Sequence, residues 1–152
     1  MARTAEQQAL VGACGFIGLR IGEALSFHVD WFDPTEMMLK VRGKGDKERV
    51  VPVSERAWSA ISTAYVAAMS GDGLLIHYQD RTARKCITSL GEKAHLRRAI
   101  SSHDLRATYA TILNDSGVNI RVIQELLGHG NVSTTEVYTA VTVKAMKEAV
   151  QF

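Results

Sequence analysis

Helix-capping patterns recur at short intervals between residues 101 and 138. The Ser-x-x-Asp pattern at 101–104 and the Ser-x-x-Glu pattern at 133–136 both have the form of a capping box, in which a hydroxyl and a carboxylate bond the free N–H groups at the start of a helix. Gly117 and Gly128 follow apolar helical runs and suit the left-handed conformation that ends many helices. The spacing therefore predicts three short helices in succession, each with a defined start or end.

These helix ends bring four functional side chains into one stretch. His103 and Arg106 are three residues apart at the start of the first helix, so they point to the same side of it. His129 comes directly after Gly128, and Tyr138 lies in the first turns of the third helix. A helix N-terminus favours anions. Two imidazoles, a guanidinium and a phenol close to such helix ends therefore indicate a site for a phosphate and a nucleophile.

A tyrosine nucleophile needs help from its surroundings. The pKa of a free phenol is about 10, so about one molecule in a thousand is ionised at pH 7. Nearby cations favour ionisation, and Arg20, Lys44 and Arg106 are candidates besides the two histidines. A metal site at His103 and His129 is the rival interpretation; no cysteine or carboxylate stands at ligand spacing around them, so we predict no metal.

The first half of the chain predicts a helix and then a small sheet. Residues 6–25 have helical periodicity, interrupted by a glycine-rich stretch between 12 and 18. After this break Arg20 and Glu23 stand at i and i+3, so the carboxylate can hold the guanidinium in place. An ordinary surface ion pair is the alternative for these two residues.

Alternating residues predict three antiparallel strands. They are expected around Val29–Trp31, over 37–42 and over 49–53, where Arg49, Val51 and Val53 share one face. The glycine-rich turn at 43–48 joins the last two strands as a hairpin and carries Lys44.

Further helices are predicted along the chain. Ser54 can cap a helix over Glu55–Met69, whereas residues 79–85 form a polar loop. A Ser-x-x-Glu pattern at 89–92 predicts a short basic helix that ends near residue 100. The second C-terminal helix, capped by Asn119, is expected to turn inward Ile120, Ile123, Leu126 and Leu127. A last amphipathic piece covers residues 142–152, with Met146 and Val150 on one side.

Length and composition fit one ordinary domain. The chain has 152 residues, of which 46% are apolar and 22% charged. No apolar run approaches the roughly 20 residues of a membrane span, so no membrane partner is expected. Two cysteines without metal or disulfide spacing favour a reducing, cytoplasmic compartment. We predict an α+β fold, mostly α-helical with a small three-stranded antiparallel sheet, as a single domain over residues 1–152.

The net charge of +2 conceals three basic groups. They are Lys40, Arg42, Lys44, Lys47 and Arg49; then Arg81, Arg84 and Lys85; then Lys93, Arg97 and Arg98. Solvated surface charge explains most such groups, but three of them together with Arg106 favour a polyanionic partner.

Three segments together resemble one known family. The run Gly18–Leu25, the turn Gly43–Arg49 and the block His103–Tyr138 are similar to those of the tyrosine recombinase (phage integrase) family, close to its Xer and integrase branches. The resemblance covers most of the chain, from about residue 10 to 138. The family usually carries a separate N-terminal DNA-clamping domain, which this chain is expected to lack. Family members also often have a histidine where this chain has Ala107.

The resemblance implies a role for each candidate residue. Arg20, supported by Glu23, and Arg106 would clamp the phosphate. Lys44 would protonate the departing 5′ oxygen, and His103 would assist proton transfer. His129 would hydrogen-bond the scissile phosphate, and Tyr138 would attack it to form a 3′-phosphotyrosine link. No cofactor, metal or ATP is implied.

The resemblance also implies partners. They are double-stranded DNA at a specific recombination site, a homotetramer on that DNA, and accessory DNA-bending proteins in a bacterial host cytoplasm. The residues expected to contact DNA are Arg42, Lys47, Arg49, Arg84 and Lys85. The family passes its C-terminal segment to a neighbouring protomer; here residues 144–152 would either do so or fold back onto their own domain.

Two other functions remain open from the sequence. A type IB topoisomerase uses the same chemistry without strand exchange. A non-catalytic helix-turn-helix module could be built from the two helices between Leu105 and Leu127, joined at Gly117. This second alternative leaves Arg20, His129 and Tyr138 without roles.

Overall fold

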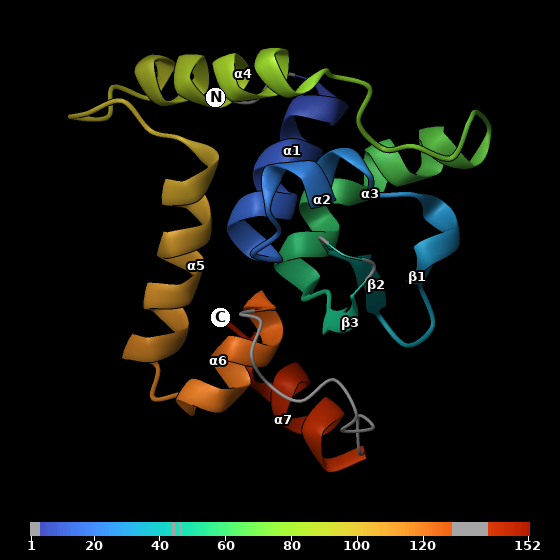
Figure 1. Ribbon diagram of the computed structural model, residues 1–152. Coiled ribbons are helices and arrows are strands. Elements are labelled where there is room, and N and C mark those ends of the chain that lie inside the picture. The colour runs from blue at the N-terminus through green and yellow to red at the C-terminus, as the bar shows by residue number, and fades with distance from the viewer. Residues whose placement is uncertain (1–3, 44, 46, 129–139) are drawn as a thin grey trace.

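The computed structural model describes residues 4–43, 45, 47–128 and 140–152 of the chain. Within these residues the chain forms seven α-helices, one 3-10 helix and three β-strands (Figure 1). In chain order they are α1 (Ala5–Phe16), α2 (Ile21–Leu25), η1 (Val29–Trp31), β1 (Phe32–Asp33), β2 (Met38–Arg42), β3 (Glu48–Pro52), α3 (Glu55–Met69), α4 (Asp80–Lys93), α5 (Ser102–Asp115), α6 (Ile120–Leu127) and α7 (Ala140–Ala149). The predicted α+β class is confirmed.

Two hydrophobic clusters organise these elements. The larger cluster joins α1, α2, the sheet, α3 and α4, and the smaller one joins α5, α6 and α7. In Figure 1, α4 lies across the top, α5 descends along one side, and α6 and α7 lie below the sheet. The loop after α1 and the end of α6 come together between the two clusters, because both bond the side chain of Arg106. None of the helices in the described part of the chain is long and apolar enough to cross a bilayer.

The break between α1 and α2 falls later than the glycines suggested. Helix α1 begins at a capping box of Thr4 with Gln7 and continues through Gly12 to Phe16. A Cβ atom on Gly12 would lie 2.6 Å from the Cβ of Ala60, so this glycine lets α3 approach α1 closely. The chain leaves the helix only at the loop 17–20, where Gly18 has a φ of +75°.

The predicted sheet is present, with one strand displaced. Its order is β1-β2-β3, and both neighbouring pairs are antiparallel. Val29–Trp31, predicted as strand, is the 3-10 helix η1, and β1 begins one residue later. The His28 ring explains the difference, because its Nδ1 accepts a hydrogen bond from the N–H of Asp30 at 3.1 Å and so closes a local turn. Phe32 in β1 then packs against Trp58 of α3, with ring centroids 5.4 Å apart.

The prediction for residues 79–100 is wrong. Helix α4 begins at Asp80, inside the expected polar loop, and residues 94–100 are not helical. Ala83, Ile87 and Leu90 are spaced at i, i+4 and i+7, and they bury one face of α4 against the core. This apolar stripe outweighs the local Ser-x-x-Glu pattern, whose serine lies in the middle of the helix.

The C-terminal helices begin and end as the capping patterns predicted. In the first box the Ser101 N–H donates to Asp104 Oδ2 at 2.8 Å, and Gly128 ends α6 with a φ of +69°. Ile120 is the exception: it was expected to face inward but is 60% exposed at the first position of α6. The box at 133–136 lies outside the described residues.

Helix α7 folds back onto its own chain. Met146 and Val150 are fully or almost fully buried in the smaller cluster, and the Phe152 ring lies 6.0 Å from that of Tyr109. Lys147 reaches Glu36, before β2, with 3.4 Å between Nζ and Oε2. Within one chain the segment 144–152 therefore packs on its own domain, and its transfer to a neighbouring protomer stays a prediction.

Candidate active site

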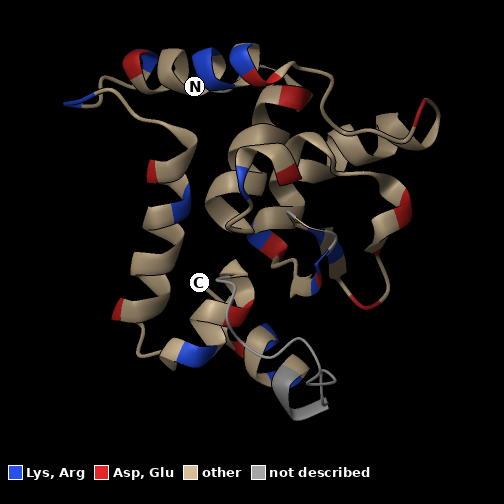
Figure 2. Cartoon of the chain, in the orientation of Figure 1, with Lys and Arg blue, Asp and Glu red and all other residues tan. Residues whose placement is uncertain are grey.

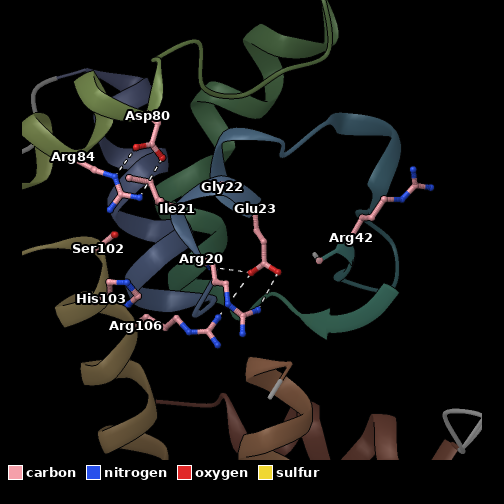
Figure 3. A pocket seen from close by; sticks show the side chains of 11 residues that line it. Arg20, Ile21, Gly22, Glu23, Arg42, Asp80, Arg84, Ser102, His103 and Arg106 are labelled. Carbon is pink, nitrogen blue, oxygen red and sulfur yellow. Dashed lines mark hydrogen bonds and ion pairs between the residues drawn. The ribbon is translucent and has the colours of Figure 1, made fainter. Parts of the chain in front are cut away.

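A pocket of about 500 Å³ lies between α2, the end of β2, α4 and the start of α5. Four arginines and two carboxylates line it: Arg20, Arg42, Arg84 and Arg106 with Glu23 and Asp80. His103 also lines the pocket, beside Arg106 (Figure 3). The predicted common side of these two residues is confirmed, and the pocket carries an excess of positive charge.

Arg20 enters the pocket from the loop before α2. Its backbone N–H donates to Glu23 Oε1 at 2.8 Å, which fixes the start of the helix. Its side chain is 46% exposed, and Nη1 lies 3.7 Å from Glu23 Oε2. The predicted Arg20–Glu23 pair therefore exists, and within the described residues it leaves most donors of the Arg20 guanidinium available for an anion.

Arg106 is held more rigidly. Its Nη1 donates to the carbonyl of Gly18 at 3.0 Å, and its Nη2 donates to the carbonyl of Leu127 at 2.7 Å. Nη1 is also 3.8 Å from Glu23 Oε1. The buried guanidinium thus joins α5 to the loop before α2 and to the end of α6, and it presents its remaining donors to the pocket.

Burial and neighbouring positive charges both lower the pKa of Arg106. Burial and then the positive charges of Arg20 and Arg49 lower this pKa to about 10. The nearby carboxylate of Glu23 only partly opposes this effect. The positive groups in this region are incompletely neutralised, and an anion in the pocket would relieve their repulsion.

Arg49 departs from its expected place. It was predicted to contact DNA, but its side chain is only 8% exposed and pairs with Glu23 through two hydrogen bonds, at 2.6 and 3.0 Å. Its Nε donates to the Leu126 carbonyl at 3.1 Å. Arg49 therefore lies behind the pocket instead of on its open side. The strand alternation contained the signal, since Arg49 shares a face with Val51 and Val53, which are buried.

The other expected DNA contacts are exposed. Arg42 and Arg84 line the pocket, and Lys47 and Lys85 lie on the surface nearby in sequence. Carboxylates already pair with the two arginines, Glu48 with Arg42 and Asp80 with Arg84. Figure 2 shows Lys and Arg along α4 and on the hairpin strands, with acidic positions among them. DNA would have to compete with these exposed pairs.

Three predicted catalytic residues, Lys44, His129 and Tyr138, lie outside the described residues. Their described neighbours belong to this region: Gly43 lines the pocket, and Arg49 packs against Gly128, where an added Cβ would lie 2.9 Å from Nη1. In the part of the chain that the structure describes, no group of three or more metal-ligating side chains occurs.

Comparison with known proteins agrees with this architecture. Residues 2–145 match the model of the phage integrase family. Tyrosine recombinase XerC of Listeria welshimeri is 39% identical over 144 residues, which cover 86% of this chain and 48% of that protein. The chain thus spans about half the length of the curated relatives it matches.

Two solved structures have the same fold. The crystal structure of XerA recombinase superposes with a TM-score of 0.76 at 32% identity, covering 95% of this chain and 56% of that one. XerH recombinase, in a post-cleavage complex with a palindromic difH substrate, superposes with a TM-score of 0.70 at 25% identity, covering 95% and 45%. Since the family model matches nearly the whole sequence, the chain belongs to the phage integrase family.

Proposed function

We propose that the chain is the catalytic domain of a site-specific tyrosine recombinase, acting as an integrase of a phage or other mobile element. The observation that carries the proposal is the cluster of three guanidinium groups around one carboxylate. Arg20, Arg49 and Arg106 all lie within 4 Å of Glu23. One negative charge cannot balance three positive ones, and a phosphodiester supplies a further negative charge on oxygens that guanidinium groups bind well.

Arg20 and Arg106, hereafter the two pocket arginines, have complementary properties for this task. Arg106 is buried and fixed by two carbonyl groups, so it offers a preorganised donor to a phosphate oxygen. Arg20 is half-exposed and can turn toward the bound phosphate. Together they would stabilise the charge that builds in a pentavalent transition state, where loss of one donor typically costs about a hundredfold to a thousandfold in rate.

The remaining residues complete a balanced transfer. The Tyr138 oxygen forms the new bond to phosphorus, and the bond from phosphorus to the 5′ oxygen breaks. His103 assists removal of the phenol proton, Lys44 protonates the 5′ oxygen, and His129 hydrogen-bonds the phosphate. The product is a 3′-phosphotyrosine link with a free 5′ hydroxyl. Attack by another strand's 5′ hydroxyl reverses the step and rejoins the DNA without ATP.

The proposed partner is double-stranded DNA carrying a specific recombination site. The pocket's excess of arginine supports a polyanion, and XerH, which has the same fold, is described in complex with its difH substrate. Strand exchange needs two duplexes, so we also propose assembly of a tetramer on DNA. Accessory DNA-bending proteins and a cytoplasmic location belong to the same proposal.

Covalent capture tests the chemistry. A pool of nicked duplexes of random sequence, in which the short cleaved strand diffuses away, traps the adduct and allows the captured DNA to be amplified and sequenced. We expect a covalent adduct that maps to Tyr138 by mass spectrometry. Tyr138→Phe should lose the adduct and keep DNA binding, whereas Tyr78→Phe, in the loop before α4, should keep both.

Plasmid relaxation and DNA binding separate the alternatives. Relaxation of supercoiled plasmid without strand exchange would favour a type IB topoisomerase. DNA binding with no adduct under any condition would favour the helix-turn-helix module and overturn the proposal. The buried side chain of Arg106 supports the enzyme, because a helix pair that reads a DNA groove does not need a buried guanidinium.

A further inference from the structure

Arg49 makes contacts that go beyond one ion pair. All three of its nitrogens donate: Nη1 and Nη2 to the Glu23 carboxylate, and Nε to the carbonyl of Leu126. These bonds run from β3 to α2 and from β3 to the end of α6, across 26 and 77 residues of sequence. One buried side chain therefore links β3, α2 and the end of α6.

The groups that Arg49 holds are those that place the pocket arginines. Glu23 fixes the backbone of Arg20 through the 2.8 Å hydrogen bond and lies beside the guanidinium of Arg106. Two hydrogen bonds hold the end of α6: Arg49 donates to the carbonyl of Leu126, and Arg106 donates to the carbonyl of Leu127. A movement of Arg49 would be passed to both pocket arginines, through Glu23 on one side and through α6 on the other.

We propose that Arg49 is a positioning residue of the site, setting the separation of Arg20 and Arg106. It does not touch the phosphate, because its donors bond the Glu23 carboxylate and the Leu126 carbonyl. The inference rests on the proposed function only for its consequence in catalysis; its geometric content concerns the two pocket arginines alone.

The chemistry of arginine suits this role. A planar guanidinium has donors at fixed angles, so it can bond a carboxylate with two nitrogens and a carbonyl with the third. A lysine at the same place keeps the charge but has a single nitrogen at the end of a flexible chain. Burial of an ion pair gives little net stability compared with apolar packing, so the value of this pair lies in the geometry it imposes.

A DNA-free experiment tests the geometry. Side-chain ¹H–¹⁵N NMR follows the Nε–H groups of Arg20 and Arg106 while inorganic phosphate is added as the probe anion. We expect Arg49→Lys to shift both signals in the free protein and to weaken phosphate binding about fivefold or more, because preorganised donors lose their alignment. Val51→Ala, a core substitution on the same strand, is the matched control: it should lower the melting temperature and leave both signals and phosphate affinity unchanged.

A second measurement extends the test to the reaction. With DNA captured by the wild type, at saturating concentration and well below the melting temperature, Arg49→Lys should slow adduct formation about thirtyfold or more, since small misplacements of positioning groups have effects of that size. DNA affinity should change less than about threefold, because most phosphate contacts are untouched. Glu23→Gln should slow the reaction as well, and the double variant should be no slower than the worse single one, because both substitutions break the same link.

The outcomes are distinct. Unshifted Arg20 and Arg106 signals in Arg49→Lys would overturn the inference whether or not the protein cleaves DNA. If Val51→Ala and Arg49→Lys change the Arg20 and Arg106 signals and the phosphate affinity equally, the inference is also overturned. Arg49 then has a purely structural role. Absence of any adduct from the wild type would overturn the proposed function, and the NMR comparison would still decide the inference.

Discussion

Glu23 and Glu48 meet similar partners in opposite surroundings. Glu23 is bonded by Arg49, and its side chain is 6% exposed. Glu48 lies 3.2 Å from both Lys40 and Arg42 and is 37% exposed. Glu48 and Arg49 are neighbours on β3, so strand alternation sends one to the surface and the other behind the pocket.

The two carboxyls reach a lowered pKa by different routes. Burial pushes the pKa of Glu23 upward, and the hydrogen bonds and charge of Arg49, with help from Arg20, more than offset it. The pKa of Glu48 is lowered directly by hydrogen bonds from Lys40 and Arg42, and water screens this group. A buried carboxylate between cations therefore fixes geometry, whereas the same arrangement at the surface only adjusts local charge.

The largest expected effect is on stability. Glu23→Gln leaves the buried guanidinium of Arg49 without a counter-charge and should lower the free energy of unfolding by about 3 kcal/mol. The matched substitution Glu48→Gln should change it little, since its partners remain hydrated. Urea denaturation of both variants at pH 7 measures the difference. Equal losses would mean that burial does not distinguish the two sites.

Gly128→Ala places a methyl group against the guanidinium of Arg49. Gly128 and Gly117 both have positive φ, +69° and +78°, but only Gly128 has a close neighbour, Arg49, at 2.9 Å from an added Cβ. Gly117→Ala should cost about 1 kcal/mol for its backbone conformation alone. Gly128→Ala should cost about 1–2 kcal/mol more, because the methyl group displaces the guanidinium.

Thermal or urea unfolding of both alanine variants gives this difference directly. The Gly117 variant is the control for the conformational cost, because no atom lies within 4 Å of its added Cβ. If the two variants lose the same stability, Arg49 accommodates the methyl group, and its contacts with Glu23 are looser than the distances indicate.

The capping patterns explain why the C-terminal helices could be predicted from the sequence. Ser101, Asn119 and Gly128 act on backbone groups within a few residues, so local sequence determines where α5 begins and where α6 begins and ends. His103 and Arg106 came together in the pocket for the same reason. The sequence did not predict the start of α4, because the Ser-x-x-Glu pattern at 89–92 indicated a later helix start. The apolar stripe that includes Ala83 and Ile87 is stabilised by burial against residues far away in sequence.

The burial of Arg49 could not be predicted from its charge. The charge of Arg49 favours a DNA contact, whereas its register with Val51 favours burial, and the structure has the buried arrangement. The partners that make burial acceptable, Glu23 and the Leu126 carbonyl, are far away in sequence. Pairing over such distances depends on the tertiary fold, which composition and periodicity do not specify.

The pH dependence of stability offers a finer comparison. The pKa of Glu23 lies below its ordinary value in the folded state, against about 4.3 in the unfolded chain. Its contribution is therefore complete above about pH 5 and is lost as the pH falls through the folded pKa. The difference in unfolding free energy between wild type and Glu23→Gln should be constant from pH 7 to about 5 and should narrow below. A difference that widens toward acid would reverse the assigned sign.

The smallest expected effect concerns the surface carboxylate. Glu48→Gln frees Lys40 and Arg42 from their acidic partner, so under the proposed function DNA binding should strengthen about threefold at about 50 mM salt. The gain should vanish near about 500 mM salt, where exposed charges are screened within a few ångströms. Fluorescence anisotropy with a labelled duplex measures both affinities, and Glu55→Gln, an exposed carboxylate at the start of α3, serves as the control. A gain that persists at high salt would mean that Glu48 shapes the hairpin itself, and the contrast with Glu23 would then be one of degree.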